Sequence, residues 1–249
     1  MPELPGPAVS RATGVRPLLV LHGSVGSPGN FGPLLSSLAD VAQRTVCAPA
    51  YGGRGTAPLA AAQAELLPVA RRLVAESPDG SIDVVGHSLG GLHGLLLAGA
   101  GVPVRRLVGL GACFRGLPAR LADPRLRRVP ARGIVRFFSA GAAEVMTDRP
   151  GEVPGLPVPL GSLFDAGLSV VSVVSDADHV VPEASSDLRG LAGAPEGPGG
   201  AAADAAGADA AGADAAAPDP APAFHLVRVH GVRHENLPQL VDEVLAALD

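Results

Sequence analysis

The sequence predicts an α/β protein, with a mostly parallel sheet of about six strands and helices on both faces. Short runs of branched apolar residues alternate along the chain with longer segments of helical periodicity. Glycine-rich or polar motifs follow several of these runs directly, and ligands of such sheets bind beyond the carboxyl ends of the strands. The 249 residues suffice for one large core, and we expect a single domain over 1–249.

The first half of the chain contains four predicted strands. These strands span 17–21, 45–48, 82–85 and 104–110, and the predicted helices between them span 31–39, 59–76 and 92–98. The second strand is stopped by Pro49, and Pro68 is expected to kink the helix over 59–76.

The alternation breaks over 114–161, which is rich in Arg, Pro and Gly, and we expect a short cap there over the carboxyl edge of the sheet. It resumes with strands at 169–174 and 224–229 and a final helix at 237–248. Between these strands, 190–223 consists almost entirely of Ala, Gly, Pro and acidic residues. Such a segment buries too little apolar surface to offset its ordering entropy, so we expect a disordered surface loop.

Composition excludes several classes of function. The net charge is −5, which argues against nucleic acid as a partner. No apolar run approaches the length of a transmembrane helix, and the first residues lack the basic and apolar regions of a signal peptide. We therefore expect a cytoplasmic protein, or a secreted one if the true start lies upstream. The two cysteines, Cys47 and Cys113, are expected to be buried free thiols.

The motif Gly86-His87-Ser88-Leu89-Gly90 is the strongest functional signal. It matches G-x-S-x-G and lies between a predicted strand and a predicted helix, which is the context of a nucleophile elbow. Glycine at the first and last positions removes the Cβ atoms that would collide where strand and helix meet. The alternative is a tight turn in which the serine only caps the helix.

Candidates for an acid and a base follow the last two strands. Asp176 and Asp178 lie in the loop after 169–174, and the residues alone leave both open. Of the two histidines after 224–229, His230 directly ends the strand, whereas His234 lies further into the loop, ahead of the final helix. We favour His234 as the base, and the order Ser, acid, His is that of a nucleophile-elbow hydrolase.

Three further histidines, His22, His87 and His179, lie in loops at the same predicted edge, and we interpret them as loop-ordering residues. A metal site made from them is disfavoured, because no His-x-x-x-His or Cys-x-x-Cys pattern accompanies them. We expect no metal and no cofactor.

These motifs together resemble the α/β-hydrolases, and most of all the class 2 triacylglycerol lipases and esterases of actinobacteria. The stretches that carry the resemblance are 19–26, 30–34, 48–56, 83–91, 104–110 and 161–164. The acid of that family lies two positions before a Val-Val-like pair, which implies Asp178, and its His precedes the last helix, which implies His234. The residue after the first His-Gly supplies an oxyanion N–H in the family, which implies Ser24.

The resemblance implies an esterase or lipase that acts on a small-molecule ester or lipid. Ser88 would be the nucleophile, and the backbone N–H groups of Leu89 and Ser24 would form the oxyanion hole. Phe137 and Phe138 of the cap are expected to line an apolar acyl pocket. The alternatives are a thioesterase or acyltransferase with the same triad, or a catalytically silent binding protein. The family usually carries an export signal and lacks the 190–223 segment, and the resemblance does not identify the substrate.

Overall fold

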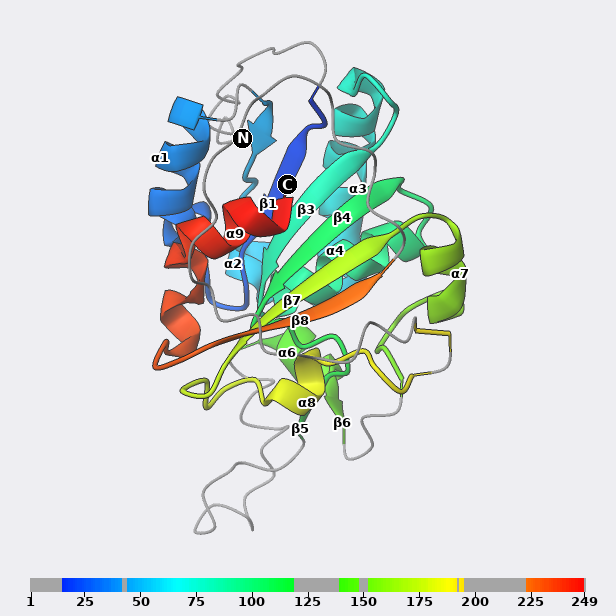
Figure 1. Ribbon diagram of the computed structural model, residues 1–249. Coiled ribbons are helices and arrows are strands. Elements are labelled where there is room, and N and C mark those ends of the chain that lie inside the picture. The colour runs from blue at the N-terminus through cyan, green and yellow to red at the C-terminus, as the bar shows by residue number, and fades with distance from the viewer. Residues whose placement is uncertain are drawn as a thin grey trace, which may run out of the picture.

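A six-stranded parallel sheet with helices on both faces forms the centre of the molecule (Figure 1). The structure is a computed structural model, and it describes residues 15–41, 44–118, 139–147, 152–191, 193–194 and 223–248. Within these ranges the strand order is β2-β1-β3-β4-β7-β8, and every neighbouring pair is parallel. The strands are β1 (Leu18–Leu21), β2 (Val46–Cys47), β3 (Ile82–His87), β4 (Val104–Leu110), β7 (Ser169–Ser175) and β8 (Phe224–Val229). The predicted fold class is confirmed.

The central strands are buried on both faces, as expected for a parallel sheet covered by helices. Every residue of β1 and β3 is buried, and β2 and β8 form the partly exposed edges. The predicted strands at 104–110 and 224–229 coincide with β4 and β8.

Helices α3 and α4 pack on one face of the sheet, and α1 and α9 pack on the other (Figure 1). The helical segments on the first face are α2 (Gly52–Gly55), α3 (Leu59–Glu76), α4 (Leu89–Gly99) and α7 (Leu160–Asp165). Those on the second face are η1 (Pro28–Phe31), α1 (Gly32–Val41), η3 (His234–Gln239) and α9 (Val241–Leu248). None of the helices in the described ranges is long and apolar enough to cross a membrane.

The final helix differs from the prediction of one continuous helix over 237–248. A 3-10 segment, η3, runs to Gln239, and α9 begins only at Val241 after Leu240, whose ψ of 81° is not helical. Pro238 lies inside the 3-10 segment, two residues before the break, and has no N–H to donate to an α-helical hydrogen bond. The apolar spacing of the segment did not reveal this break.

Only part of the predicted cap falls within the described residues. That part consists of β5 (Leu117–Pro118), α6 (Ala140–Glu144), β6 (Met146–Thr147) and the segment from 152 onward. β5 and β6 form a separate two-stranded parallel sheet. Phe137 and Phe138, expected to line the acyl pocket, lie outside the described residues, as does most of 190–223. At the start of that segment, Leu191 and Ala194 pack against the core, and α8 (Glu183–Ser186) precedes it.

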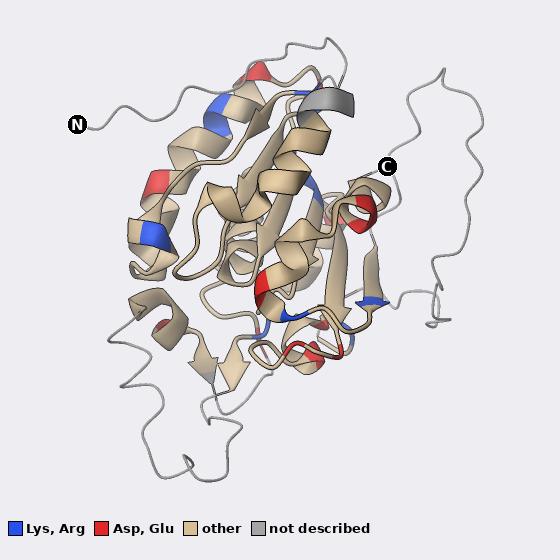
Figure 2. Cartoon of the chain, turned by 90° about the vertical axis from the view of Figure 1, so that its left-hand side faces the viewer, with Lys and Arg blue, Asp and Glu red and all other residues tan. Residues whose placement is uncertain are grey.

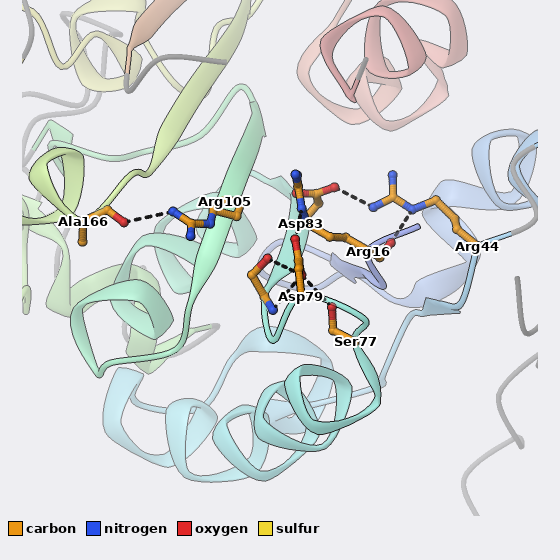
Figure 3. A network of polar contacts seen from close by, with 8 residues as sticks. Arg16, Arg44, Ser77, Asp79, Asp83, Arg105 and Ala166 are labelled. Carbon is orange, nitrogen blue, oxygen red and sulfur yellow. Dashed lines mark hydrogen bonds and ion pairs between the residues drawn. The ribbon is translucent and has the colours of Figure 1, made fainter. Parts of the chain in front are cut away.

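An ion-pair network with a buried centre joins the amino ends of the strands (Figure 3). Asp83, near the start of β3, accepts a hydrogen bond from Arg44 at 2.7 Å, and both side chains are buried. Arg16 lies 3.5 Å from the other oxygen of Asp83 and 2.8 Å from Asp79. Burial alone would raise the pKa of Asp79. Hydrogen bonds from Ser81, Arg16 and Ser77 outweigh burial and lower this pKa to about 2. The network lies at the edge of the sheet opposite the sequence motifs.

Removing one partner of the buried Arg44–Asp83 pair should destabilise the fold strongly. Arg44→Met leaves the Asp83 carboxylate buried without its closest cation, which costs about 3–5 kcal/mol when a buried pair is broken. The double variant Arg44→Met/Asp83→Leu should lose less stability than Arg44→Met alone, because no uncompensated charge remains. Urea unfolding followed by circular dichroism measures both values. Equal losses in the single and double variants would contradict this account.

Candidate active site

The serine of the G-x-S-x-G motif lies at the sharp turn between β3 and α4. Ser88 has φ 53° and ψ −122°, a backbone conformation that residues other than glycine rarely adopt. Its backbone N–H donates to Leu110 O at 3.0 Å, so the adjacent strand β4 holds the turn in place. Strain of this kind persists only where the surrounding structure enforces it, and it gathers at functional sites.

The glycines of the turn are required by close backbone contact. A Cβ on Gly86 would lie 2.5 Å from backbone atoms of Gly90 and Gly91. A Cβ on Gly90 would collide with the carbonyl oxygen of Leu21 and lie 2.7 Å from that of His22. Helix α4 therefore starts directly against the end of β1, and no side chain fits between them.

One Asp and one His from the last two strand ends meet in a buried hydrogen bond. Asp178 lies in the loop after β7, and His234 begins η3 after β8. Asp178 Oδ2 and His234 Nδ1 are 2.7 Å apart, and only 2% of the Asp side chain and 11% of the His side chain are exposed. A carboxylate only accepts, so Nδ1 carries the proton and Nε2 is left as the basic nitrogen.

The surroundings of Asp178 favour its ionised form. Its Oδ1 accepts hydrogen bonds from the backbone N–H groups of Val180 and Val181, at 2.8 and 2.9 Å. Burial alone would raise the pKa of Asp178, but the hydrogen bonds from His234, Val181 and Val180 outweigh it and lower the pKa below the ordinary value. The imidazole of His234 is thus held by a charged acceptor.

The other acid and the other histidine of these loops form a separate pair on the surface. Asp176 Oδ2 lies 2.9 Å from His230 Nδ1, and Asp176 Oδ1 accepts from the N–H of Gly231 at 2.8 Å. The two side chains are 60% and 80% exposed. The structure therefore joins Asp178 to His234 and Asp176 to His230, and only the first pair is sheltered from water.

Two residues that the sequence analysis missed contact this site. A Cβ on Gly111, which has φ +53°, would lie 2.8 Å from Asp178 Oδ2 and 3.1 Å from His234 Nδ1, so only glycine fits beside that hydrogen bond. Tyr51 is buried and donates from its hydroxyl to the carbonyl oxygen of His22 at 2.6 Å. Burial raises the pKa of Tyr51, which keeps this hydroxyl a donor. The one available signal for Gly111 was its position directly after a strand.

The loop after β1 lies against the elbow. A Cβ on Gly23 would lie 2.9 Å from the Cβ of Ser88, and Ser24 follows directly. His22 Nδ1 donates to the carbonyl oxygen of Gly23 at 2.9 Å, which also accepts from the N–H of Gly26 at 3.1 Å. These bonds, with that from Tyr51, hold the loop beside Ser88.

Leu89 is the first residue of α4, where the N–H has no acceptor within the helix. Its side chain is covered by the cap: a Cβ on Gly141 of α6 would lie 3.2 Å from Leu89 Cδ2. The N–H of Ala140 donates to Thr56 O at 2.8 Å, so α6 is attached to the loop before α3. The described part of the cap thus packs directly on the start of α4.

The sequence also singled out three further histidines and two cysteines. His22 and His87 are buried, and His179 is exposed. Over the described ranges, no group of three or more His, Cys, Asp or Glu side chains is placed to hold a metal ion. Cys47 and Cys113 are free, the first half-buried and the second buried. Acidic and basic residues occur at separate places along the described chain, as the coloured cartoon of Figure 2 shows.

Among solved structures, several hydrolases of low sequence identity share the fold. A monoacylglycerol lipase from Paleococcus ferrophilus is 17% identical with a TM-score of 0.51, and the match covers 93% of this chain and 91% of that one. A type II thioesterase from the borrelidin biosynthetic cluster is 17% identical with a TM-score of 0.56, covering 96% and 92%. An esterase from a Rhodococcus species is 18% identical with a TM-score of 0.51, covering 93% and 90%.

These likenesses show a common fold and do not by themselves identify a substrate. No curated protein matches the sequence. The family model described as alpha/beta hydrolase fold matches residues 16–149, which is more than half of the chain and includes β1 to β4 and the elbow. The chain therefore belongs to the alpha/beta hydrolase fold family.

Proposed function

We propose that the protein is a serine hydrolase of carboxylic esters with apolar acyl groups. The observation that carries the proposal is the buried hydrogen bond between Asp178 and His234, at the same edge of the sheet as the strained turn of Ser88. A nucleophile in an elbow, an acid after a later strand and a histidine after the last strand are the parts of a Ser-His-Asp triad.

In the proposed reaction, Ser88 Oγ attacks the ester carbonyl while His234 Nε2 takes the hydroxyl proton. Asp178 stays ionised, keeps the proton of His234 on Nδ1 and stabilises the imidazolium that forms. His234 then protonates the departing alcohol, which leaves an acyl group on the serine oxygen. A water molecule, activated by His234 in the same way, releases the acid and restores the enzyme.

Negative charge develops on the carbonyl oxygen in each tetrahedral intermediate. The N–H of Leu89, at the free amino end of α4, and the N–H of Ser24, in the loop held by Tyr51, are the proposed donors to it. One such donor contributes about 3–4 kcal/mol of transition-state stabilisation in a protease precedent. Neither step requires a metal or a cofactor.

A thioester hydrolase or acyltransferase with the same triad is the second candidate, because a thioesterase is among the structures that share the fold. Parallel assays on p-nitrophenyl esters and acyl-CoA thioesters of matched acyl length separate the two. Higher kcat/KM for the thioesters would replace the ester assignment. The chain has no Trp and a single Tyr, which favours acyl chains over sugars that stack on aromatic rings.

Ser88→Ala should abolish hydrolysis and leave the fold intact. Loss of the nucleophile lowers kcat by about six orders of magnitude in a protease precedent. A fluorophosphonate probe should label the wild type at Ser88 and leave the variant unlabelled, with circular dichroism as the check on folding. Ser36→Ala, on the exposed face of α1, is the matched control and should keep both labelling and turnover. Turnover retained by Ser88→Ala would contradict the proposal, and so would a wild-type protein that the probe does not label.

Substituting the two loop acids should have very different effects on kcat. Asp178→Asn removes the charged acceptor of His234 Nδ1 and favours the wrong tautomer, which lowers kcat about 10⁴-fold in a protease precedent. Asp176→Asn changes an exposed pair with His230 and an exposed hydrogen bond from Gly231, and it should alter kcat by less than about threefold. Steady-state kinetics on one p-nitrophenyl ester compares them directly. If Asp176→Asn were the inactive variant, the acid would be misassigned.

The stability that Asp178 contributes should depend on pH. Because its pKa is lowered in the folded protein, its contribution is complete above the unfolded value of about 3.9 and is lost as the pH falls through the folded value. The melting temperature of Asp178→Asn should therefore lie below that of the wild type at pH 7, and the two should converge as the pH falls below about 3.9. A difference that stays constant over this range would show that the carboxylate charge is not involved.

A further inference from the structure

Three buried histidines are not used as acid or base in the proposed mechanism: His22, His87 and His93. Of these, His87 is the one in ring contact with His234, with centroids 4.5 Å apart and planes tilted by 41°. The contact joins the last residue of β3 to the first residue of η3. It therefore bridges the nucleophile turn and the loop of the proposed base.

We infer that His87 is a positioning residue, which holds His234 on the nucleophile elbow by donating a hydrogen bond to its backbone carbonyl. This inference rests on the proposed function for its catalytic consequence. The bond joins His87 Nε2 to the carbonyl oxygen of His234 over 3.0 Å. A carbonyl oxygen only accepts, so Nε2 carries the proton.

The bond gives His234 two fixed points. Its side chain is held by Asp178 at Nδ1, and its backbone is held by His87 at the carbonyl oxygen. With both constrained, little freedom remains for Nε2 to change its position. Proton transfer is sensitive to such movement, because a misplacement of about 1 Å costs on the order of 100-fold in rate.

The same ring also contacts the oxyanion loop. A Cβ on Gly23 would lie 3.2 Å from His87 Nδ1 and 2.9 Å from Ser88 Cβ. His87 precedes Ser88 directly in the chain. The imidazole of His87 thus contacts both the loop of the proposed oxyanion hole and the proposed base, and His87 is the chain neighbour of the proposed nucleophile.

The role requires a neutral ring, and the surroundings keep it neutral. The titratable groups that face His87 are His234, Asp178 and His22. Burial and the adjacent His234 lower the pKa of His87 to about 3. When His234 becomes an imidazolium in the transition state, it therefore does not meet a second positive charge at ring-contact distance.

Two substitutions separate the hydrogen bond from the shape of the side chain. His87→Phe keeps a flat ring but leaves the His234 carbonyl without its donor. His87→Gln places an amide N–H near the position of Nε2 and restores a donor. The control is His93→Phe, an equally buried imidazole that packs edge-on to Tyr51 and bonds Gln63 over 2.9 Å.

Kinetics on a p-nitrophenyl ester should show a kcat effect with little change in KM. We expect His87→Phe to lower kcat about 10- to 100-fold, His87→Gln to recover most of the loss, and His93→Phe to leave kcat unchanged. A low-field proton NMR signal of the His234 Nδ1–H, bonded to Asp178, should exchange faster in His87→Phe and return to normal in His87→Gln.

The NMR readout requires no turnover, so it decides the positioning role even if the chain hydrolyses no ester. An unchanged signal and unchanged kcat in a folded His87→Phe would overturn the inference. So would a folded His87→Gln that is as impaired as the Phe variant. Failure of the proposed function is recognised separately, by a wild type that a fluorophosphonate does not label at Ser88.

Discussion

The site depends on the direct contact between the start of α4 and the end of β1. Gly90 lies so close to the carbonyl oxygens of Leu21 and His22 that any side chain would collide with them. This contact brings the loop of the proposed oxyanion hole, which begins at His22, against the turn of Ser88 without any intervening residue. Because the strands are parallel, the loops after β7 and β8, which carry Asp178 and His234, emerge at the same edge as the turn of Ser88.

The two edges of the sheet differ: a buried ion pair lies at one edge, and residues with strained backbone lie at the other. At the amino ends, Arg44 and Asp83 form a buried ion pair that joins the start of β3 to the chain entering β2. At the carboxyl ends lie the non-glycine residues with positive φ that occur in the described ranges: Val25, Arg54 and Ser88. Arg54 donates to the carbonyl oxygen of Val25 at 2.8 Å, so two strained residues stabilise each other across the oxyanion loop. Strained loops of this kind need a well-anchored scaffold, and the opposite edge supplies it.

Sequence patterns predicted the sheet and both loops of the proposed triad, because strand periodicity and glycine turns are local properties. Residue types alone could not choose between Asp176 and Asp178, which lie two residues apart in one loop, and only the family resemblance implied Asp178. In the structure the two acids differ in burial, which depends on contacts with residues far along the chain, such as Gly111 beside Asp178. The role of Tyr51 could not be predicted from sequence either, because its hydrogen-bond partner, the carbonyl oxygen of His22, lies far away along the chain. Pro238, by contrast, was a local signal against one continuous α-helix over 237–248, and the apolar spacing obscured it.

The two Asp–His pairs show how position gives identical groups different chemistry. The Asp176–His230 contact is open to water, where screening leaves an ion pair little energy and little control over geometry. The Asp178–His234 contact is largely buried, its carboxylate is held by two further N–H groups, and its imidazole lies against neutral His87. A polar interaction in such a partly buried setting is stronger than one in water. A histidine that is to gain and lose a proton without moving requires the enclosed setting of the Asp178–His234 pair. The exposed Asp176–His230 pair does not provide such a setting.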